Sequence, residues 1–115
     1  MKVVIEISNR GSAIRAARQQ IQESNAGKSV DFRLFFESAK SLFTELNPTR
    51  LDLLNTLSKI GLCSVNELAS SIQNDYSSVE TDVSRLEELG LIERTEEGKI
   101  SVPFDSIEIL MPLAA

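Results

Sequence analysis

Polar side chains suited to contacting nucleic acid are concentrated between residues 74 and 85 of this 115-residue chain. They comprise an amide, a phenol, three hydroxyls and a guanidinium: Asn74, Tyr76, Ser77, Ser78, Thr81 and Arg85. Small hydroxyls permit close approach to phosphates and base edges, and an arginine can make a bidentate contact with guanine. Arg94 and Lys99 follow shortly after and could bind flanking phosphates. The pattern makes double-stranded DNA a candidate partner of this segment.

The same side chains also have an ordinary structural explanation. Ser77 or Ser78 can cap a helix through its hydroxyl. Arg85 can pair with Asp82 or Glu88 on the surface of its own helix. Both explanations stay open on the sequence alone.

Catalytic chemistry has little support. The chain has no histidine, which removes the usual zinc sites and histidine-based acid/base or triad chemistry. Two carboxylate pairs, Asp82 with Glu88 and Asp75 with Glu80, fall on predicted helix surfaces, where solvated charge is the ordinary explanation. We therefore expect no enzymatic activity, no cofactor and no metal site.

Cys63 is the single cysteine, so no intramolecular disulfide can form. It lies just before a predicted helix, whose dipole could lower the thiol pKa and permit redox sensing. The alternative is a buried, inert thiol.

The length and the 42% hydrophobic content suit one compact soluble unit with a single core. No apolar run approaches the roughly 18 residues that a membrane span needs, and Glu6 interrupts the segment where a signal peptide is apolar. We expect a cytoplasmic protein without a membrane partner.

The first 47 residues predict a strand, a helix, a second strand and a short helix. Residues 3–7 are a β-branched run that leaves through a turn at 9–11, and 12–25 have helical periodicity through Ile14, Ala17 and Ile21. Residues 30–37 alternate with period two, which predicts a strand with one buried face. Ser38 can cap a helix that ends before Asn47.

From residue 48 the pattern is three helices and a hairpin. Asn47 and Pro48 begin a helix that ends at Gly61, and the S-x-x-E box of Ser64 and Glu67 begins another of about ten residues. Residues 76–89 form the next helix, with Val79, Val83, Leu86 and Leu89 turned inward.

A hairpin follows, with strands at 91–95 and 99–102 around Gly98, and Pro103 ends its second strand. The tail, residues 105–113, alternates in the manner of a further strand. Two helices joined by a short turn and followed at once by a hairpin predict an α+β fold, a winged helix-turn-helix with an N-terminal strand-helix-strand extension.

Four segments carry a family resemblance: LNPTRLDLLNTL, SVNELASSI, DYSSVETDVSRLEELGLIER and GKISVPFDSIEI. In these the chain resembles small prokaryotic winged helix-turn-helix DNA-binding regulators related to the multiple-antibiotic-resistance class, from about Phe35 to Leu113. The resemblance implies a sequence-specific transcriptional regulator that places the 76–89 helix in the major groove, with the 91–102 hairpin as wing. An antitoxin-like autorepressor is one form of such a protein. Winged helices also dock proteins, so the fold alone leaves the function open.

The charge distribution departs from these relatives, which commonly have basic or amide residues where this chain has Asn74, Ser77, Ser78, Glu80 and Thr81. The net charge is −5, and from residue 48 onward five basic side chains face twelve acidic ones. Either a local patch, with Arg85, Lys99 and first-helix arginines of a second subunit, binds DNA over two half-sites, or the 76–89 helix meets a protein partner.

We divide the chain into residues 1–47, an extension for homodimerisation, and residues 48–115, the winged helix with its C-terminal strand. The first segment has too few elements to stand alone. The tail strand near Ile107 could complete their sheet, and a dimer could form in this way. The alternative is that these strands only close the core of the same monomer.

Overall fold

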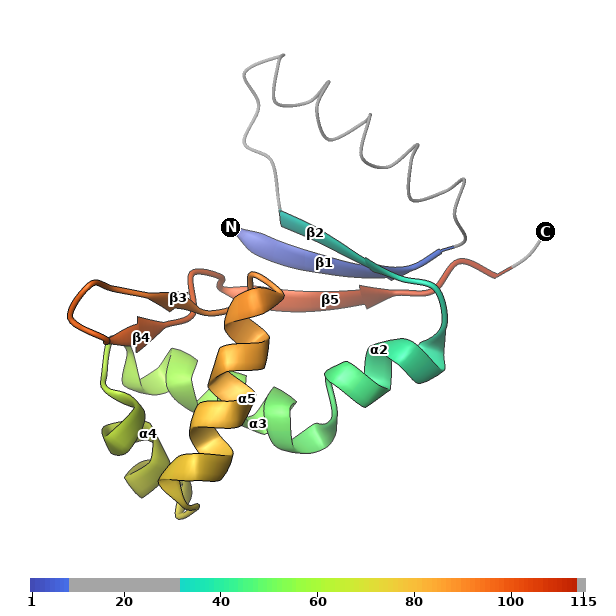
Figure 1. The fold of residues 1–115 in the computed structure, drawn as a ribbon. Helices are drawn as coiled ribbons and strands as arrows, with labels where there is room; N and C mark the ends of the chain where they lie inside the picture. The colour runs from blue at the N-terminus through green and yellow to red at the C-terminus, as the bar shows by residue number, and fades with distance from the viewer. Residues whose placement is uncertain (9–31, 114–115) are drawn as a thin grey trace. The chain divides into compact units, whose positions relative to one another are not determined.

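A computed structural model describes residues 1–8 and 32–113 of the chain (Figure 1). The chain divides into two units, residues 1–45 with 104–115, and residues 46–103, instead of the single unit expected from its length. The predicted turn at 9–11 and helix at 12–25, like the first residues of the strand predicted at 30–37, lie outside the described residues.

The first unit contains a three-stranded parallel sheet with the order β2-β1-β5. Its strands are β1 (Lys2–Ile7), β2 (Phe32–Phe36) and β5 (Ser106–Leu110). Val3, Val4 and Ile5 are all buried, so both faces of β1 are covered, as is usual for the central strand of a parallel sheet.

The second strand differs from its prediction. All five residues of β2 are half-buried, and none is fully buried on either face. The expected single buried face is therefore wrong. β2 is an edge strand of the described sheet, so on one side it lacks a neighbouring strand whose side chains would help to cover its two faces.

The tail of the chain forms β5, which pairs in parallel with β1, so that Val3 lies beside Ile107 and Ile5 beside Ile109. The predicted division at 47/48 assigned this strand to the second domain, whereas the structure assigns it to the first unit. The tail of the same chain thus completes the sheet of the N-terminal strands, as expected. The C-terminal strand itself was predicted correctly.

The helix α2 (Ala39–Glu45) belongs to the same unit and contacts β2. Its cap is Ser38, whose Oγ accepts a hydrogen bond from the backbone N–H of Ser41 at 3.1 Å. Leu42 is its fully buried residue.

The second unit begins with α3 (Pro48–Ile60), capped by Asn47, whose Oδ1 accepts from the backbone N–H of Arg50 at 2.9 Å. Leu53, Leu54 and Leu57 fill its buried side. The helix ends at Gly61, whose φ of 83° is a left-handed conformation that favours glycine. These features agree with the sequence prediction.

Two further helices follow, α4 (Val65–Ile72) and α5 (Tyr76–Glu88), and they pack on each other. The predicted capping box at Ser64 and Glu67 is complete: each side chain accepts from the backbone N–H of the other residue at 3.1 Å. The turn between the helices starts at Gln73, whose φ of 56° is left-handed.

The hairpin consists of β3 (Glu93–Arg94) and β4 (Ile100–Ser101), shorter than predicted, and Gly98 supplies the positive φ of its turn. Cys63 exchanges two backbone hydrogen bonds with Ile100, of 3.1 and 2.7 Å, and so ties the hairpin to the connection before α4. The fold class is α+β, as predicted. None of the helices in the described part of the chain is both long and apolar enough to span a bilayer.

Candidate nucleic-acid interface

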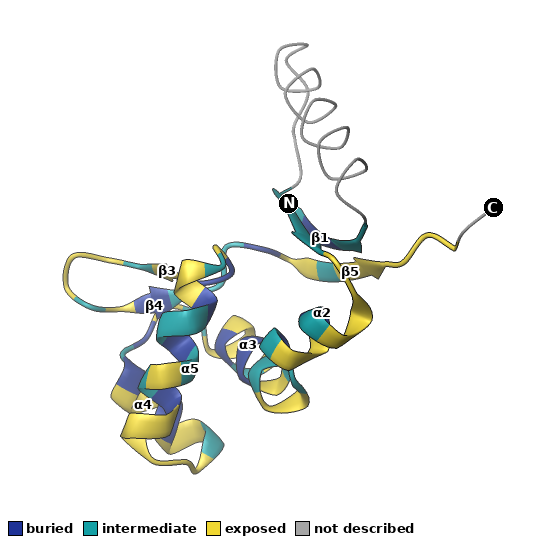
Figure 2. Cartoon of the chain, turned by 45° about the vertical axis from the view of Figure 1, so that its right-hand side comes forward, coloured by how far each residue is buried: buried dark blue, intermediate teal, exposed yellow. Residues whose placement is uncertain are grey.

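The helix α5 is buried along one side and open along the other. Val79, Val83 and Leu86 point into the core of the second unit. Helix phase places Ser77, Thr81, Arg85 and Glu88 opposite them, and we call these four residues the outer face of α5. Figure 2 shows buried and exposed bands along this helix. The hydroxyl-rich side of the helix is therefore not packed beneath neighbouring strands.

The predicted site residues at the start of α5 lie close together and are exposed. Tyr76 has half of its surface exposed. The hydroxyl of Thr81 donates to the backbone oxygen of Ser77 at 3.0 Å, and Oδ1 of Asn74 accepts from the backbone N–H of Asp75 at 2.9 Å. With its proton used inside the helix, the Thr81 hydroxyl offers its lone pairs outward as an acceptor.

The cap of α5 is Asp75, and neither of the two serines proposed from the sequence. Its Oδ2 accepts from the backbone N–H of Ser78 at 2.8 Å and its Oδ1 from the Ser78 hydroxyl at 2.9 Å. These hydrogen bonds, first from the backbone and then from the side chain of Ser78, lower the pKa of the Asp75 carboxyl. A carboxylate thus occupies part of the helix start that the sequence had offered to a phosphate.

Replacing Asp75 with asparagine is expected to leave the thermal midpoint at neutral pH nearly unchanged, since asparagine caps helices as well as aspartate. The two proteins should diverge in acid. A carboxyl with a lowered folded pKa stabilises above its unfolded pKa, about 3.9, and this stabilisation is lost as the pH falls through the folded value. We expect thermal unfolding, followed by circular dichroism from about pH 6 to about pH 3, to show a smaller fall in the thermal midpoint for Asp75→Asn than for the wild type. Thermal midpoints that fall equally with pH in both proteins would contradict the assignment of Asp75 as the charged cap of α5.

Arg85 takes the structural role that the sequence left open. Its guanidinium contacts Glu88 at 3.0 Å within the outer face. Asp82, the other partner considered, instead binds Arg50 of α3 at 2.9 Å, with both side chains largely buried. Arg85 is half-buried and keeps its position on the outer face, so a contact to DNA would exchange Glu88 for another acceptor.

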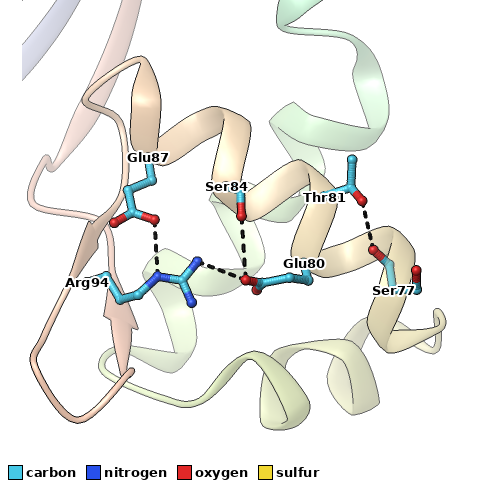
Figure 3. A network of polar contacts seen from close by, with 6 residues as sticks. All are labelled: Ser77, Glu80, Thr81, Ser84, Glu87 and Arg94. Atoms are coloured by element: carbon cyan, nitrogen blue, oxygen red, sulfur yellow. Dashed lines mark hydrogen bonds and ion pairs between the residues drawn. The ribbon is translucent and has the colours of Figure 1, made fainter.

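Arg94 lies on the hairpin but is directed toward α5 (Figure 3). Its Nε donates to Glu87 at 3.1 Å and its terminal nitrogen to Glu80 at 3.3 Å. Burial alone would lower the pKa of this guanidinium, but the hydrogen bond with Glu87 and the charges of both carboxylates outweigh burial and raise it. The predicted phosphate contact therefore has a competitor: Arg94 joins the hairpin to the helix.

Lys99 is the remaining basic candidate on the hairpin and is exposed. Its backbone N–H donates to Oγ1 of Thr95 at 3.1 Å, which fixes the hairpin turn. The structure therefore brings Lys99 into the same unit as Arg85 and Arg94 with its side chain open to solvent.

Sequence reasoning missed the partners of these arginines. The four acids of α5 are all held by arginines, and three of them, Glu80, Asp82 and Glu87, by arginines of other elements. Arg50 and Asp82 are 32 residues apart, so no local spacing could have paired them. The acidic character of α5 is thus largely neutralised by the framework around it.

Cys63 is a free cysteine with a buried side chain. Burial raises the pKa of its thiol, and the negative charge of Glu67 adds to this against the opposing charge of Lys99. The suggestion that the dipole of α4 lowers the pKa is wrong, because desolvation of the thiolate dominates. The buried, inert thiol agrees with the structure.

A family model described as HVO_A0114 matches residues 45–109, which is more than half of the chain. The matched range contains α3, α4, α5 and the hairpin, and therefore all the candidate residues described above. Neither the comparison with curated proteins nor the one with solved structures finds a match. By the extent of this match, the chain belongs to the HVO_A0114 family.

Proposed function

We propose that residues 46–103 form a winged helix-turn-helix module that binds double-stranded DNA, and that the protein is a cytoplasmic, sequence-specific transcriptional regulator. In this proposal α4 and α5 are the two helices of the motif, α5 enters the major groove and the β3–β4 hairpin is the wing. The resemblance noted in the sequence supports the same assignment. The observation that carries the proposal is the exposed outer face of α5.

The distribution of charge around α5 is compatible with this role. The acids Glu80, Glu87 and Asp82 lie on the flanks of the helix, where Arg94 and Arg50 compensate them. On the outer face, Arg85 and Glu88 cancel each other and the remaining side chains are hydroxyls. A neutral helix surface of this kind makes few phosphate contacts, so its binding should depend on salt less steeply than that of a basic winged helix.

The Arg85–Glu88 pair gives a direct test of base readout by α5. Arg85→Ala is expected to weaken binding to the preferred duplex by about 1–3 kcal/mol, because a bidentate arginine–guanine contact has this value. Glu88→Gln should act in the opposite direction, since it weakens the contact that competes for Arg85 and removes a charge that repels phosphates. Fluorescence anisotropy with the preferred duplex and a scrambled duplex measures both effects.

The matched control for these variants is Asp52→Asn on α3, which removes one exposed acid outside both α5 and the wing. If Asp52→Asn strengthens binding as much as Glu88→Gln, the effect is one of net charge and the readout by Arg85 is refuted. Wild-type affinity in Arg85→Ala would refute the contact as well.

The proposal as a whole is tested by selecting bound duplexes from a random pool at low and moderate salt. An enriched motif that survives moderate salt is the expected result. Retention of all sequences at low salt and of none at moderate salt would show unspecific attraction only and would overturn sequence-specific binding.

A second function, docking of a protein partner, is favoured by one observation. Both arginines of the candidate site hold carboxylates of their own unit, and depletion of uncompensated charge is typical of protein interfaces. The selection separates the two functions. Absence of any motif, together with a stoichiometric protein complex that Tyr76→Ala abolishes, would establish docking through α5 in place of DNA binding.

A further inference from the structure

The strand β5 and the residues just after it contain most of the exposed large apolar side chains in the described part of the first unit. Within the described residues β5 pairs with β1 alone, so its other edge faces no described strand. Four large apolar side chains on and after this strand are exposed, at 42%, 46%, 52% and 81% of their surface: Ile109, Leu110, Met111 and Leu113. An apolar strand edge of this kind is a template for pairing with another strand.

The charges that usually protect such an edge are already engaged. The amino terminus contacts Asp105 at 2.8 Å and lowers the pKa of its carboxyl. Lys2 contacts Glu108 at 3.1 Å. Lysine and proline are the common edge-blocking residues, and β5 contains neither. Because Asp105 and Glu108 each contact a positive charge, they repel a second copy of this acidic strand less strongly than the sequence suggests.

We propose that a second copy of this chain covers the edge, with the two β5 strands antiparallel about a two-fold axis at Ile109. This register places Ile109 opposite its own counterpart and Ile107 opposite Met111. On the other face of the sheet it places Glu108 opposite Leu110. The ladder spans residues 107–111 and pairs apolar residues along one face.

Neighbouring registers are less favourable. An axis at Glu108 sets two carboxylates directly opposite each other, which is destabilising. An axis at Leu110 brings Pro112 into the ladder, where it has no N–H to donate. An axis at Ile107 draws Asp105 into the ladder opposite Ile109. Self-pairing about Ile109 is the register that avoids all three conflicts, which is why a second copy is the occupant that fits.

This dimer differs from the one expected from the sequence, which assigned dimerisation to residues 1–47. It also does not depend on DNA binding, because no residue of α5 or the hairpin takes part. For a DNA-binding dimer, the two-fold axis would require a palindromic operator.

Light-scattering mass over a concentration series tests the interface. The wild type is expected at twice the 12.7 kDa of the chain. Ile109→Lys should give a monomer, because two lysines then meet at the axis. Leu110→Lys, one residue further, should remain dimeric, because each new lysine faces Glu108 of the other copy. A monomeric wild type, a dimeric Ile109→Lys or a monomeric Leu110→Lys would overturn the proposal.

Disulfide trapping tests the register without introducing a charge. Ile109→Cys should form an intermolecular disulfide under mild oxidation, since opposite residues in an antiparallel pair have Cα atoms about 4.5–5.5 Å apart. Ser106→Cys is the control, because its two copies lie far apart on either side of the axis. The native Cys63 is buried and should give no crosslink in the wild type. Equal trapping of both variants, or none for Ile109→Cys, would refute the register.

Discussion

Replacing Leu86 with alanine is expected to lower the free energy of unfolding by about 2–5 kcal/mol, the usual cost of a leucine-to-alanine change in a core. Leu86 is fully buried on α5, and the backbone oxygen of the same residue also accepts from Leu91 at 2.9 Å, where the chain leaves the helix. Small domains are stable by only roughly 5–15 kcal/mol, so this single change removes a large part of the stability.

Urea unfolding measured by the fluorescence of Tyr76 is suited to this variant. Tyr76 is the only tyrosine and the chain has no tryptophan, so the signal reports on the unit that contains α5. Leu62→Ala is the control, because this leucine is exposed and its replacement should change the free energy of unfolding by no more than about 0.5 kcal/mol. Equal midpoints for the two variants would contradict the packing described for α5.

Arg94→Ala is expected to have the second largest effect and to lower the free energy of unfolding by about 1–3 kcal/mol. The substitution leaves Glu80 and Glu87 without their shared cation. Oε2 of Glu80 is buried with no hydrogen-bond partner in the described part of the chain, so Oε1, which accepts from Arg94 and Ser84, carries its interactions. Two carboxylates seven residues apart on one helix would then face the hairpin unpaired.

Lys99→Ala is the matched control, since it removes a cation from the same hairpin at an exposed position and should cost less than about 0.5 kcal/mol. Adding Glu80→Gln to Arg94→Ala should recover part of the lost stability, because the amide needs no counter-charge. Equal stabilities of Arg94→Ala and Lys99→Ala would show that the contacts in Figure 3 contribute nothing.

Local signals explain why most elements could be predicted from the sequence. Asn47 with Pro48, and Ser64 with Glu67, specify helix starts within four residues, and the hydrogen bonds found at these caps are the ones that the residue types imply. Gly61 and Gly98 mark turns through their positive φ in the same local way.

Long-range relations could not be predicted in this way. The pairing of β5 with β1 joins residues about a hundred positions apart, and periodicity gives the existence of a strand without its neighbour. The burial of β2 depended on its place at the edge, which follows from the sheet order.

The candidate site shows the same limit. The exposed start of α5, with Tyr76, Ser77 and Thr81, follows from helix phase and was predicted. The cap at Asp75 and the ion pairs of Arg50 and Arg94 were not, because a charged residue in a sequence does not reveal which opposite charge the fold will bring to it. These pairs compensate the acids of α5 itself, whereas the acidic excess of the chain comes from carboxylates outside that helix.

The sheet of the first unit joins strands that the ribosome makes at very different times. Residues 46–103 are continuous in the chain and can fold as soon as they leave the exit tunnel, since the domain that is complete first folds first. β1, by contrast, must wait for β5, which is translated after that whole unit. β1, apolar and lacking one of its neighbours, therefore stays open to chaperones until a strand about a hundred residues further along the chain has been made.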